Sequence, residues 1–177
     1  EGKDILFNEG KIAPLIKHPN IVKIREVIDS SGPTFIVMEK YNENLLQLMN
    51  RKTLSYEEKM KIIDGVLSAI EYIHSLYICH RDIKLENILI DEEGEPHIGD
   101  FGFAAFCDLP VSGCFGSDGY AAPEVFIDAP YDGKKADMWS IGVLLFSILA
   151  ERKPFSRSND NNLVDFTNIP KEMRPYI

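Results

Sequence analysis

The sequence is poor in cysteine and in positive charge. Its three cysteines, Cys79, Cys107 and Cys114, are odd in number and form no C-x-x-C pair. This excludes a disulfide framework and a zinc site and favours free thiols in a reducing compartment. The 19 lysines and arginines are outnumbered by 28 aspartates and glutamates. The resulting formal charge of −9 argues against nucleic-acid binding and leaves basic partners plausible.

Signals for membrane insertion, secretion and a P-loop are also absent. The apolar run 138–150 is too short to span a bilayer and carries two serines, so it predicts a buried core helix that opens at Asp137. The first residues show no secretory signal, and we expect the cytoplasm, with the nucleus as an alternative. No G-x-x-x-x-G-K-[ST] pattern occurs, which excludes a P-loop enzyme.

The chain of 177 residues, 45% hydrophobic and 27% charged, has an ordinary globular composition and suffices for one domain. Residues 1–17 predict a helix that ends before Pro14, because proline removes a backbone donor and clashes one turn back. The strand-like runs 21–28 and 34–39 flank the turn 29–33 and predict a hairpin.

A capping box predicts the start of a longer helix. Ser55 is followed three residues later by Glu58, so each residue can satisfy a backbone donor of the other. Four residues of this helix are expected to share one face: Ile63, Leu67, Ile70 and His74. We expect His74 to be a packed helix residue and not a ligand. Near the end of the chain, 156–162 predicts a solvated loop followed by a short helix.

A carboxylate, an ammonium and an amide recur at fixed offsets in the stretch 80–87, H-R-D-I-K-L-E-N. Asp82 can accept a proton from a hydroxyl, Lys84 can neutralise a phosphoryl oxygen, and Asn87 can hold a metal ion. The stretch follows a helical pattern that ends near Tyr77 and precedes the apolar run 88–90, a short buried strand. It is therefore predicted to be a tight catalytic loop.

A second carboxylate follows in Asp100-Phe101-Gly102. The turn 91–94 would join the strand after Asn87 to a neighbouring strand that leads to Asp100. The oxygens of Asn87 and Asp100 would then face each other. Magnesium prefers few protein ligands of this kind together with substrate phosphates, so the sequence predicts a Mg²⁺ site.

Four motifs in order resemble the catalytic domain of eukaryotic serine/threonine protein kinases. They are H-R-D-I-K-L-E-N at 80–87, D-F-G at 100–102, A-P-E at 122–124 and D-M-W-S-I-G at 137–142. The motif style is most similar to calcium/calmodulin-dependent and microtubule-affinity-regulating kinases. Any one tripeptide would be weak evidence, but their order and spacing together are specific.

The resemblance implies an α+β, two-lobe fold. Residues 1–41 would form part of the small lobe and the hinge, and 42–177 the mostly helical large lobe without its final helices. The implied activity is transfer of the ATP γ-phosphoryl group to serine or threonine hydroxyls, with ATP and Mg²⁺ as cofactors. The glycine-rich loop and the small-lobe lysine are not in this sequence, so we expect these residues alone to be inactive. The alternative is a non-catalytic pseudokinase or scaffold.

The resemblance also assigns roles around the nucleotide. Asp82 would be the general base, Lys84 would steady the phosphoryl group, and Asn87 and Asp100 would hold Mg²⁺. At the adenine, Met38 would be the gatekeeper, and Glu39 and Tyr41 would offer backbone groups. Leu89 would lie beneath the base, and Asn44 would contact the ribose. Leu89 would join an apolar column with Met49, Leu144 and Ile148. A second column would contain Ala13, Ile24, His80 and Phe101.

Further residues have regulatory or structural roles by resemblance. Glu9 would pair with the small-lobe lysine, and without it would be an exposed helix carboxylate. Glu124 would pair with an arginine that this sequence does not contain. Asp137 would tie its helix to the catalytic loop, cap its own helix, or both. Gly102 supplies the flexible end of the D-F-G motif.

Residues 100–124 would form the activation segment. Arg81 implies that a phosphate on this segment orders it. Related kinases carry a threonine where this chain has Gly113, so Ser112 could substitute, or Asp108 could supply a constant charge. Ser117 would bridge Asp82 and Lys84 and favour serine and threonine over tyrosine. Glu86 matches a position that contacts a substrate arginine.

Overall fold

The computed structural model describes residues 9–28, 35–152 and 154. Residues 9–12 are α-helical, and a 3₁₀ turn, η1 (Ala13–Leu15), follows. The α-helical part ends before Pro14, as predicted. The predicted turn 29–33, the loop at 156–162 and the short helix after it lie outside the described residues.

The first sheet is the predicted hairpin in shorter form. β1 (Ile24–Ile28) pairs antiparallel with β2 (Phe35–Met38). The predicted strand from residue 21 begins three residues later, because Ile21 instead bridges Ile98 in the other half of the chain. Ile21 and Val22 are buried there, so this segment connects the hairpin to the rest of the molecule.

The second part of the chain contains short strands and the long helices. β3 (Glu43–Asn44), β5 (Ile88–Ile90) and β6 (Pro96–Ile98) form one antiparallel sheet, and β4 (Ile78–Cys79) pairs with β7 (Ala105–Phe106). The predicted strands on either side of the 91–94 turn are therefore confirmed. The helices are α2 (Leu45–Arg51), α3 (Tyr56–Ser75) and α4 (Gly133–Ala150), with 3₁₀ turns η2 (Leu85–Asn87), η3 (Phe101–Phe103) and η4 (Pro123–Phe126).

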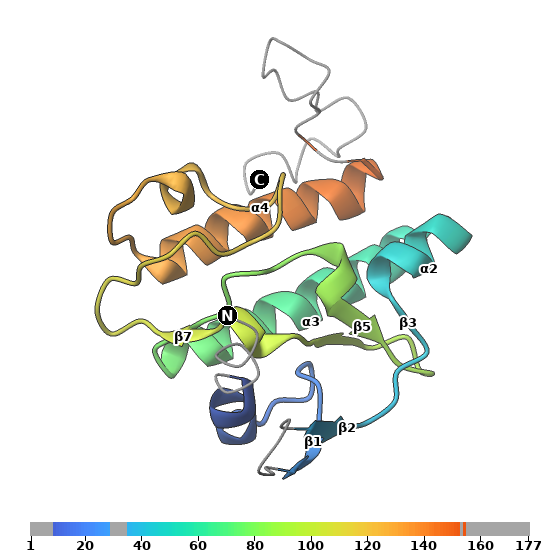
Figure 1. The fold of residues 1–177 in the computed structure, drawn as a ribbon. Coiled ribbons are helices and arrows are strands. Elements are labelled where there is room, and N and C mark those ends of the chain that lie inside the picture. The colour runs from blue at the N-terminus through green and yellow to red at the C-terminus, as the bar shows by residue number, and fades with distance from the viewer. Residues whose placement is uncertain (1–8, 29–34, 153, 155–177) are drawn as a thin grey trace.

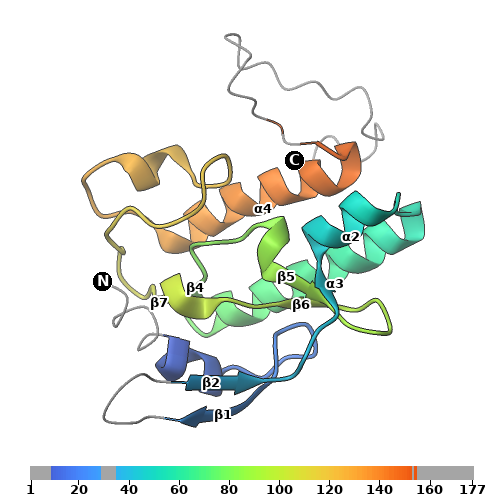
Figure 2. The same cartoon turned by 45° about the vertical axis from the view of Figure 1, so that its right-hand side comes forward.

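The elements are stacked from one end of the molecule to the other. The β1–β2 pair lies at one end and α4 at the opposite end, with α3 and the β5–β6 pair between them (Figures 1 and 2). This order of elements fits a kinase domain of mixed helix and strand content. The division of the chain between residues 41 and 42 stays a prediction.

The capping box at the start of α3 is confirmed. The Ser55 hydroxyl accepts a hydrogen bond from the Glu58 nitrogen at 3.2 Å, and the Glu58 carboxylate accepts one from the Ser55 nitrogen at 2.8 Å. Ile63 and Ile70 are buried as predicted, but Leu67 is 37% exposed. The predicted face was wrong at Leu67 because Val66 and Ile73 complete the buried face instead.

α4 begins four residues earlier than predicted. Asp132 is its N-cap, and its carboxylate accepts hydrogen bonds from the nitrogens of Lys134 and Lys135. The predicted start at Asp137 was wrong because the N-cap lies before Gly133. Gly133 packs closely against Cys79, since a Cβ at position 133 would lie 2.5 Å from the Cys79 sulfur. The apolar residues of α4 are buried as expected, apart from Met138 and Trp139 near its start.

One hydrophobic core joins α2, α3, α4 and the central strands. Leu144 and Ile148 are buried in it, and Met49 and Leu89 pack against it, which agrees with the first predicted apolar column. Ile24 also packs against this core, whereas the side chain of Ala13 lies outside the described part. No helix within the described ranges is long and apolar enough to cross a membrane.

Candidate active site

Asp137 fixes the catalytic loop from inside α4. Its carboxylate is 1% exposed and accepts hydrogen bonds from the nitrogens of His80 and Arg81, both at 2.8 Å. His74 Nε2 lies 2.9 Å from the same carboxylate. His74 was predicted to be a packed helix residue; its side chain is 14% exposed, and it pairs in addition with Asp137. Asp137 also does not cap its own helix, so of its two predicted roles the tie to the loop is the one observed.

His80 connects the catalytic loop to the D-F-G segment. Its Nδ1 accepts a hydrogen bond from the Asp82 nitrogen at 3.2 Å, so its Nε2 is the donor to the Gly99 carbonyl at 2.9 Å. The ring lies 4.8 Å from that of Phe101, and both side chains are fully buried. The two halves of the predicted site are thereby held together.

Asp82 is the centre of a compact polar cluster. Lys84 Nζ donates to its Oδ2 at 2.7 Å, and the Ser117 hydroxyl donates to its Oδ1 at 2.8 Å. Lys84 Nζ also donates to the Ser117 oxygen at 2.8 Å. The amide nitrogen of Asn87 lies 3.1 Å from Oδ2. The contacts expected of Ser117 are therefore present.

This cluster can bind and orient a hydroxyl group. The Ser117 hydroxyl already donates to Asp82, which shows that the carboxylate can receive an O–H in this geometry. Asp82 is 3% exposed, so little water competes for it. Lys84 places a positive charge beside the same point. The arrangement is suited to orienting an alcohol while negative charge is neutralised next to it.

The metal site predicted at Asn87 and Asp100 stays a prediction, and the structure shows how each residue is held. The Asn87 amide nitrogen donates to the Asp82 carbonyl at 2.8 Å, which directs the amide oxygen elsewhere as a possible ligand. The backbone carbonyl of Asn87 accepts a hydrogen bond from the Gly99 nitrogen at 2.9 Å. This bond fixes the backbone directly before Asp100. Asp100 is exposed. The described residues contain no group of three or more His, Cys, Asp or Glu that could hold a metal, and these two oxygen donors fit Mg²⁺.

Glu9 is buried, which corrects the expectation of an exposed helix carboxylate. It is 9% exposed and accepts a hydrogen bond from the Phe101 nitrogen at 3.3 Å. Burial and the nearby Asp100 raise the pKa of its carboxyl, while the Phe101 hydrogen bond opposes this shift. The expectation failed because the D-F-G segment covers Glu9 even without a lysine partner.

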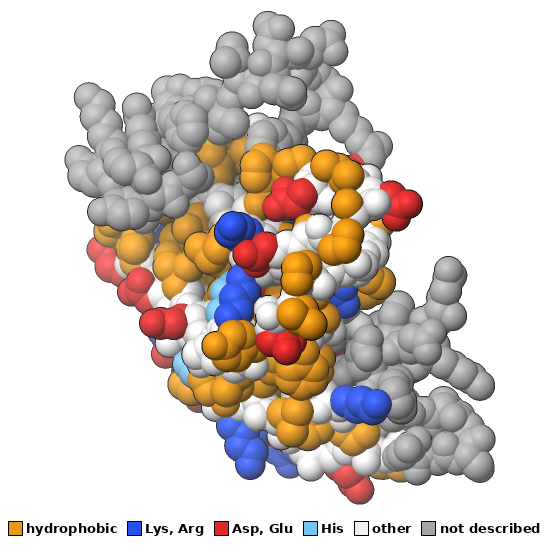
Figure 3. All heavy atoms as spheres, turned by 90° about the vertical axis from the view of Figure 1, so that its left-hand side faces the viewer, with side chains coloured by type: hydrophobic (Ala, Val, Ile, Leu, Met, Phe, Trp, Pro, Cys, Tyr) orange, Lys and Arg blue, Asp and Glu red, His pale blue; other side chains and the backbone are white. Residues whose placement is uncertain are grey.

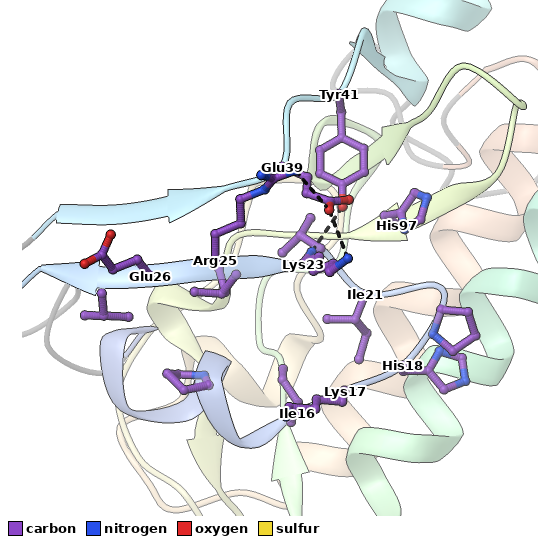
Figure 4. A pocket seen from close by; sticks show the side chains of 15 residues that line it. Ile16, Lys17, His18, Ile21, Lys23, Arg25, Glu26, Glu39, Tyr41 and His97 are labelled. Carbon is purple, nitrogen blue, oxygen red and sulfur yellow. Dashed lines mark hydrogen bonds and ion pairs between the residues drawn. The ribbon is translucent and has the colours of Figure 1, made fainter.

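The hinge residues lie beside a cavity of about 670 Å³ (Figure 4). Glu39 faces it between Lys23 and Arg25, 3.1 and 3.4 Å away, and Lys23 lowers the pKa of Glu39. The Tyr41 hydroxyl accepts from the Lys23 nitrogen at 3.1 Å. The lining includes none of the catalytic or metal-site residues, so we treat this cavity as separate from the chemistry.

Three other predicted nucleotide contacts do not line this cavity. Met38 is 38% exposed at the end of β2, and Leu89 is half-buried in β5. Asn44 caps α2: its side chain accepts from the Gln47 nitrogen at 2.9 Å. The Glu39 nitrogen donates to the Lys23 carbonyl, so the Glu39 carbonyl is the group left for a base. These nucleotide roles stay predictions.

The activation segment contacts the catalytic loop through Arg81. Arg81 donates to the carbonyls of Phe103 and Ser112. Ser112 thus contributes its backbone, and its side chain is exposed, as is that of Asp108. Gly102 is buried in η3, and Glu124 is half-buried in η4. Within the described residues, neither Asp108 nor Glu124 forms an ion pair.

The outer side of the activation segment faces solvent. Within the described residues, several of the most exposed large apolar side chains lie in this segment or directly after it: Phe106, Leu109, Phe126 and Ile127. On the corresponding face, hydrophobic and charged side chains are interspersed (Figure 3). The segment therefore has one side against the catalytic loop and one side open to other molecules.

Two residues of the site were missed by sequence reasoning. Phe115 lies against Arg81, with the guanidinium 4.3 Å from the ring centre. Tyr131 donates to the Gly113 carbonyl at 3.1 Å. No periodic pattern surrounds either aromatic residue, so only a three-dimensional arrangement could reveal these contacts. Asp132 could have been found, because an aspartate before a helical run is a common N-cap.

Comparison with known proteins agrees with this geometry. Residues 1–174 match the family model described as the protein kinase domain. The serine/threonine-protein kinase SIK1 of Rattus norvegicus is 38% identical over 158 residues, 87% of this chain. The CBL-interacting serine/threonine-protein kinase 3 of Arabidopsis thaliana is 40% identical over 157 residues, 84% of this chain. The match spans 20% of the first relative and 35% of the second. The chain belongs to the protein kinase domain family.

Proposed function

We propose that the protein transfers the γ-phosphoryl group of ATP to serine and threonine hydroxyls of protein substrates. The observation that carries the proposal is the cluster of Asp82, Lys84 and Ser117, in which a carboxylate, an ammonium and a short hydroxyl all lie within 2.8 Å of one another. The family and its serine/threonine-specific relatives support the same activity.

The chain's own residues would act mainly by positioning and charge neutralisation. Asp82 would accept the hydrogen bond of the substrate hydroxyl and then its proton. Lys84 would stay beside the transferred phosphoryl group, where its charge offsets the developing negative charge. Ser117 would hold both side chains in place. A short acceptor hydroxyl would fit this crowded cluster better than a tyrosine ring.

Asn87 and Asp100 would hold Mg²⁺ with their side-chain oxygens. When bound, the ion would neutralise phosphate charge and align the nucleotide. Met38, Glu39, Tyr41, Asn44 and Leu89 remain the proposed nucleotide neighbours. We also propose the cytoplasm as the location, which the three free cysteines support.

A peptide assay on a chain completed with a glycine-rich loop and a small-lobe lysine tests the activity. Peptides identical except for serine, threonine or tyrosine at one position should be labelled only at serine and threonine. Asp82→Asn is the matched control, since it removes the base and should abolish labelling while Mg·ATP still binds. Comparable tyrosine labelling would contradict the substrate class. Nucleotide binding without labelling of any peptide would instead favour the pseudokinase alternative.

We further propose that substrates carry an arginine near the acceptor. One carboxylate oxygen of Glu86, next to the catalytic loop residues, is buried and has no hydrogen-bond partner within the described part of the chain. Such a group has unmet acceptor capacity, which a guanidinium can satisfy. The formal charge of −9 would also attract basic substrates.

Glu86→Gln should raise the KM of an arginine-containing peptide by roughly tenfold, because it removes a charge-assisted contact. The KM of the same peptide with alanine in place of arginine should not change. Glu92→Gln, at an exposed turn position, is the matched control. An equal effect of Glu86→Gln on both peptides would contradict arginine recognition.

A further inference from the structure

Within the described residues, the Arg81 side chain contacts uncharged groups. Its guanidinium donates to the carbonyls of Phe103 and Ser112 and lies 4.3 Å from the centre of the Phe115 ring. A cation over an aromatic face is attracted by the ring. The positive charge next to the catalytic aspartate is therefore held by two carbonyls and an aromatic ring.

Phe115 also holds the two sides of the activation segment together. Its ring lies 5.3 Å from that of Phe103, which follows the D-F-G glycine. Beyond it, Val111 pairs with Tyr131 through two backbone hydrogen bonds, and the Tyr131 hydroxyl donates to Gly113. Phe115 therefore lies at the point where both ends of the segment meet Arg81.

Gly113 is compatible with this arrangement only because it has no side chain. A Cβ at position 113 would lie 2.4 Å from the Phe115 ring, and the backbone φ of +98° is one that other residues rarely adopt. A threonine could not occupy position 113 while Phe115 stays in place. The glycine and the phenylalanine are thus two parts of one arrangement.

We propose that Phe115 is a positioning residue that orders the activation segment through Arg81, so that the segment needs no phosphate to adopt its active arrangement. The proposal rests on the proposed kinase activity and adds its regulation. Arg81 precedes Asp82 directly, and its own backbone nitrogen is fixed by Asp137. Order in the segment is in this way transmitted to the catalytic base.

The test compares Phe115→Leu, which removes the ring, with Phe115→Tyr, which keeps it. Peptide phosphorylation is measured before and after treatment with a protein phosphatase. Phe115→Leu should lower kcat by about tenfold, equivalent to about 1.4 kcal/mol, with the KM for ATP nearly unchanged. Phe115→Tyr should stay close to the wild type. Neither phosphatase treatment nor Ser112→Ala should lower wild-type activity, because Ser112 contributes only its carbonyl.

Any one of four results would overturn the proposal. These are full activity of Phe115→Leu, an equal loss in Phe115→Tyr, loss of wild-type activity after phosphatase treatment, and loss of activity in Ser112→Ala. Amide hydrogen exchange of residues 103–116 gives a readout that does not need activity. Exchange there should be faster in Phe115→Leu than in the wild type and Phe115→Tyr. If no preparation phosphorylates a peptide, the proposed function fails, and the inference about Phe115 is then tested by hydrogen exchange alone. Equal exchange rates in the wild type, Phe115→Leu and Phe115→Tyr would overturn the inference.

Discussion

At the scale of single residues, Asp82 depends on a neighbour 35 positions away. Ser117 contributes one hydrogen bond to the carboxylate and accepts another from Lys84. Ser117→Ala should therefore lower kcat by about five- to tenfold, the effect of roughly 1 kcal/mol of lost hydrogen bonding. Ser117→Thr keeps the hydroxyl and should recover most of the activity. Steady-state kinetics with a serine peptide measure this, and unchanged kcat in Ser117→Ala would show that the bridge is dispensable.

The buried carboxyl of Glu9 makes stability depend on pH. Its folded-state pKa lies above the usual 4.5 because of burial and the charge of Asp100. Folding therefore favours the protonated form, and this contribution is largest below pH 4.5 and is lost as the pH rises through the folded-state pKa. Glu9→Gln should stabilise the protein at pH 7.5 by about 1 kcal/mol, and the gain should shrink as the pH falls towards 4.5.

Urea unfolding of Glu9→Gln and wild type at pH 5 and pH 7.5 measures this effect. Glu71→Gln, at an exposed position on α3, is the matched control and should change stability little at either pH. A gain from Glu9→Gln that is the same at both pH values would contradict the assignment.

At the scale of elements, α4 is the support on which the catalytic loop rests. Asp137→Ala would leave the buried nitrogens of His80 and Arg81 without an acceptor. We expect a loss of about 2 to 4 kcal/mol in the free energy of unfolding and little remaining activity. Asp132→Ala removes only the N-cap of the same helix and should cost about 1 kcal/mol without loss of activity. Equal effects of the two variants in thermal unfolding would show that Asp137 serves α4 alone.

Element prediction succeeded where local chemistry decides the structure. The capping box fixes the start of α3, and the apolar run with its turn fixes the β5–β6 pair. It failed where distant contacts decide. Leu67 satisfies the helical period, yet packing leaves it exposed. Ile21 has the character of a strand residue but leaves the hairpin to bridge Ile98.

At the scale of the whole molecule, Mg·ATP should act as a stabilising ligand, because a ligand that binds only the folded state shifts unfolding. In a chain completed with a glycine-rich loop and a small-lobe lysine, Mg·ATP should raise the midpoint of thermal unfolding by several degrees, both without further change and with Asp82→Asn. Asp100→Asn should lose most of this shift, because it removes a proposed Mg²⁺ ligand. The left-handed backbone at Asp100 also suits asparagine, so the substitution alters charge with little strain. A shift of equal size in Asp100→Asn would contradict the proposed metal site.

The catalytic centre was predictable as a set of residues but not as a network. The motif letters identify Asp82, Lys84 and Asn87, because their chemistry and spacing are local. The contact of His74 with Asp137 joins residues 63 positions apart, and no sequence period links them. Phe115 is the only aromatic residue between Phe106 and Tyr120 in the sequence, so no pattern marks it, and its contact with Arg81 depends on how the chain returns to the loop.

Backbone conformation is a further property that the motifs do not encode. Tyr77, Arg81 and Asp100 have φ values of 57°, 65° and 59°, a left-handed conformation that costs L-residues on the order of 1 kcal/mol each. Tyr77 precedes the catalytic loop, Arg81 lies within it, and Asp100 follows it. A peptide of residues 77–100 would lose these left-handed conformations. Grafting residues 80–87 onto another scaffold would transfer the side chains but not their arrangement. The active geometry belongs to the folded domain that imposes it.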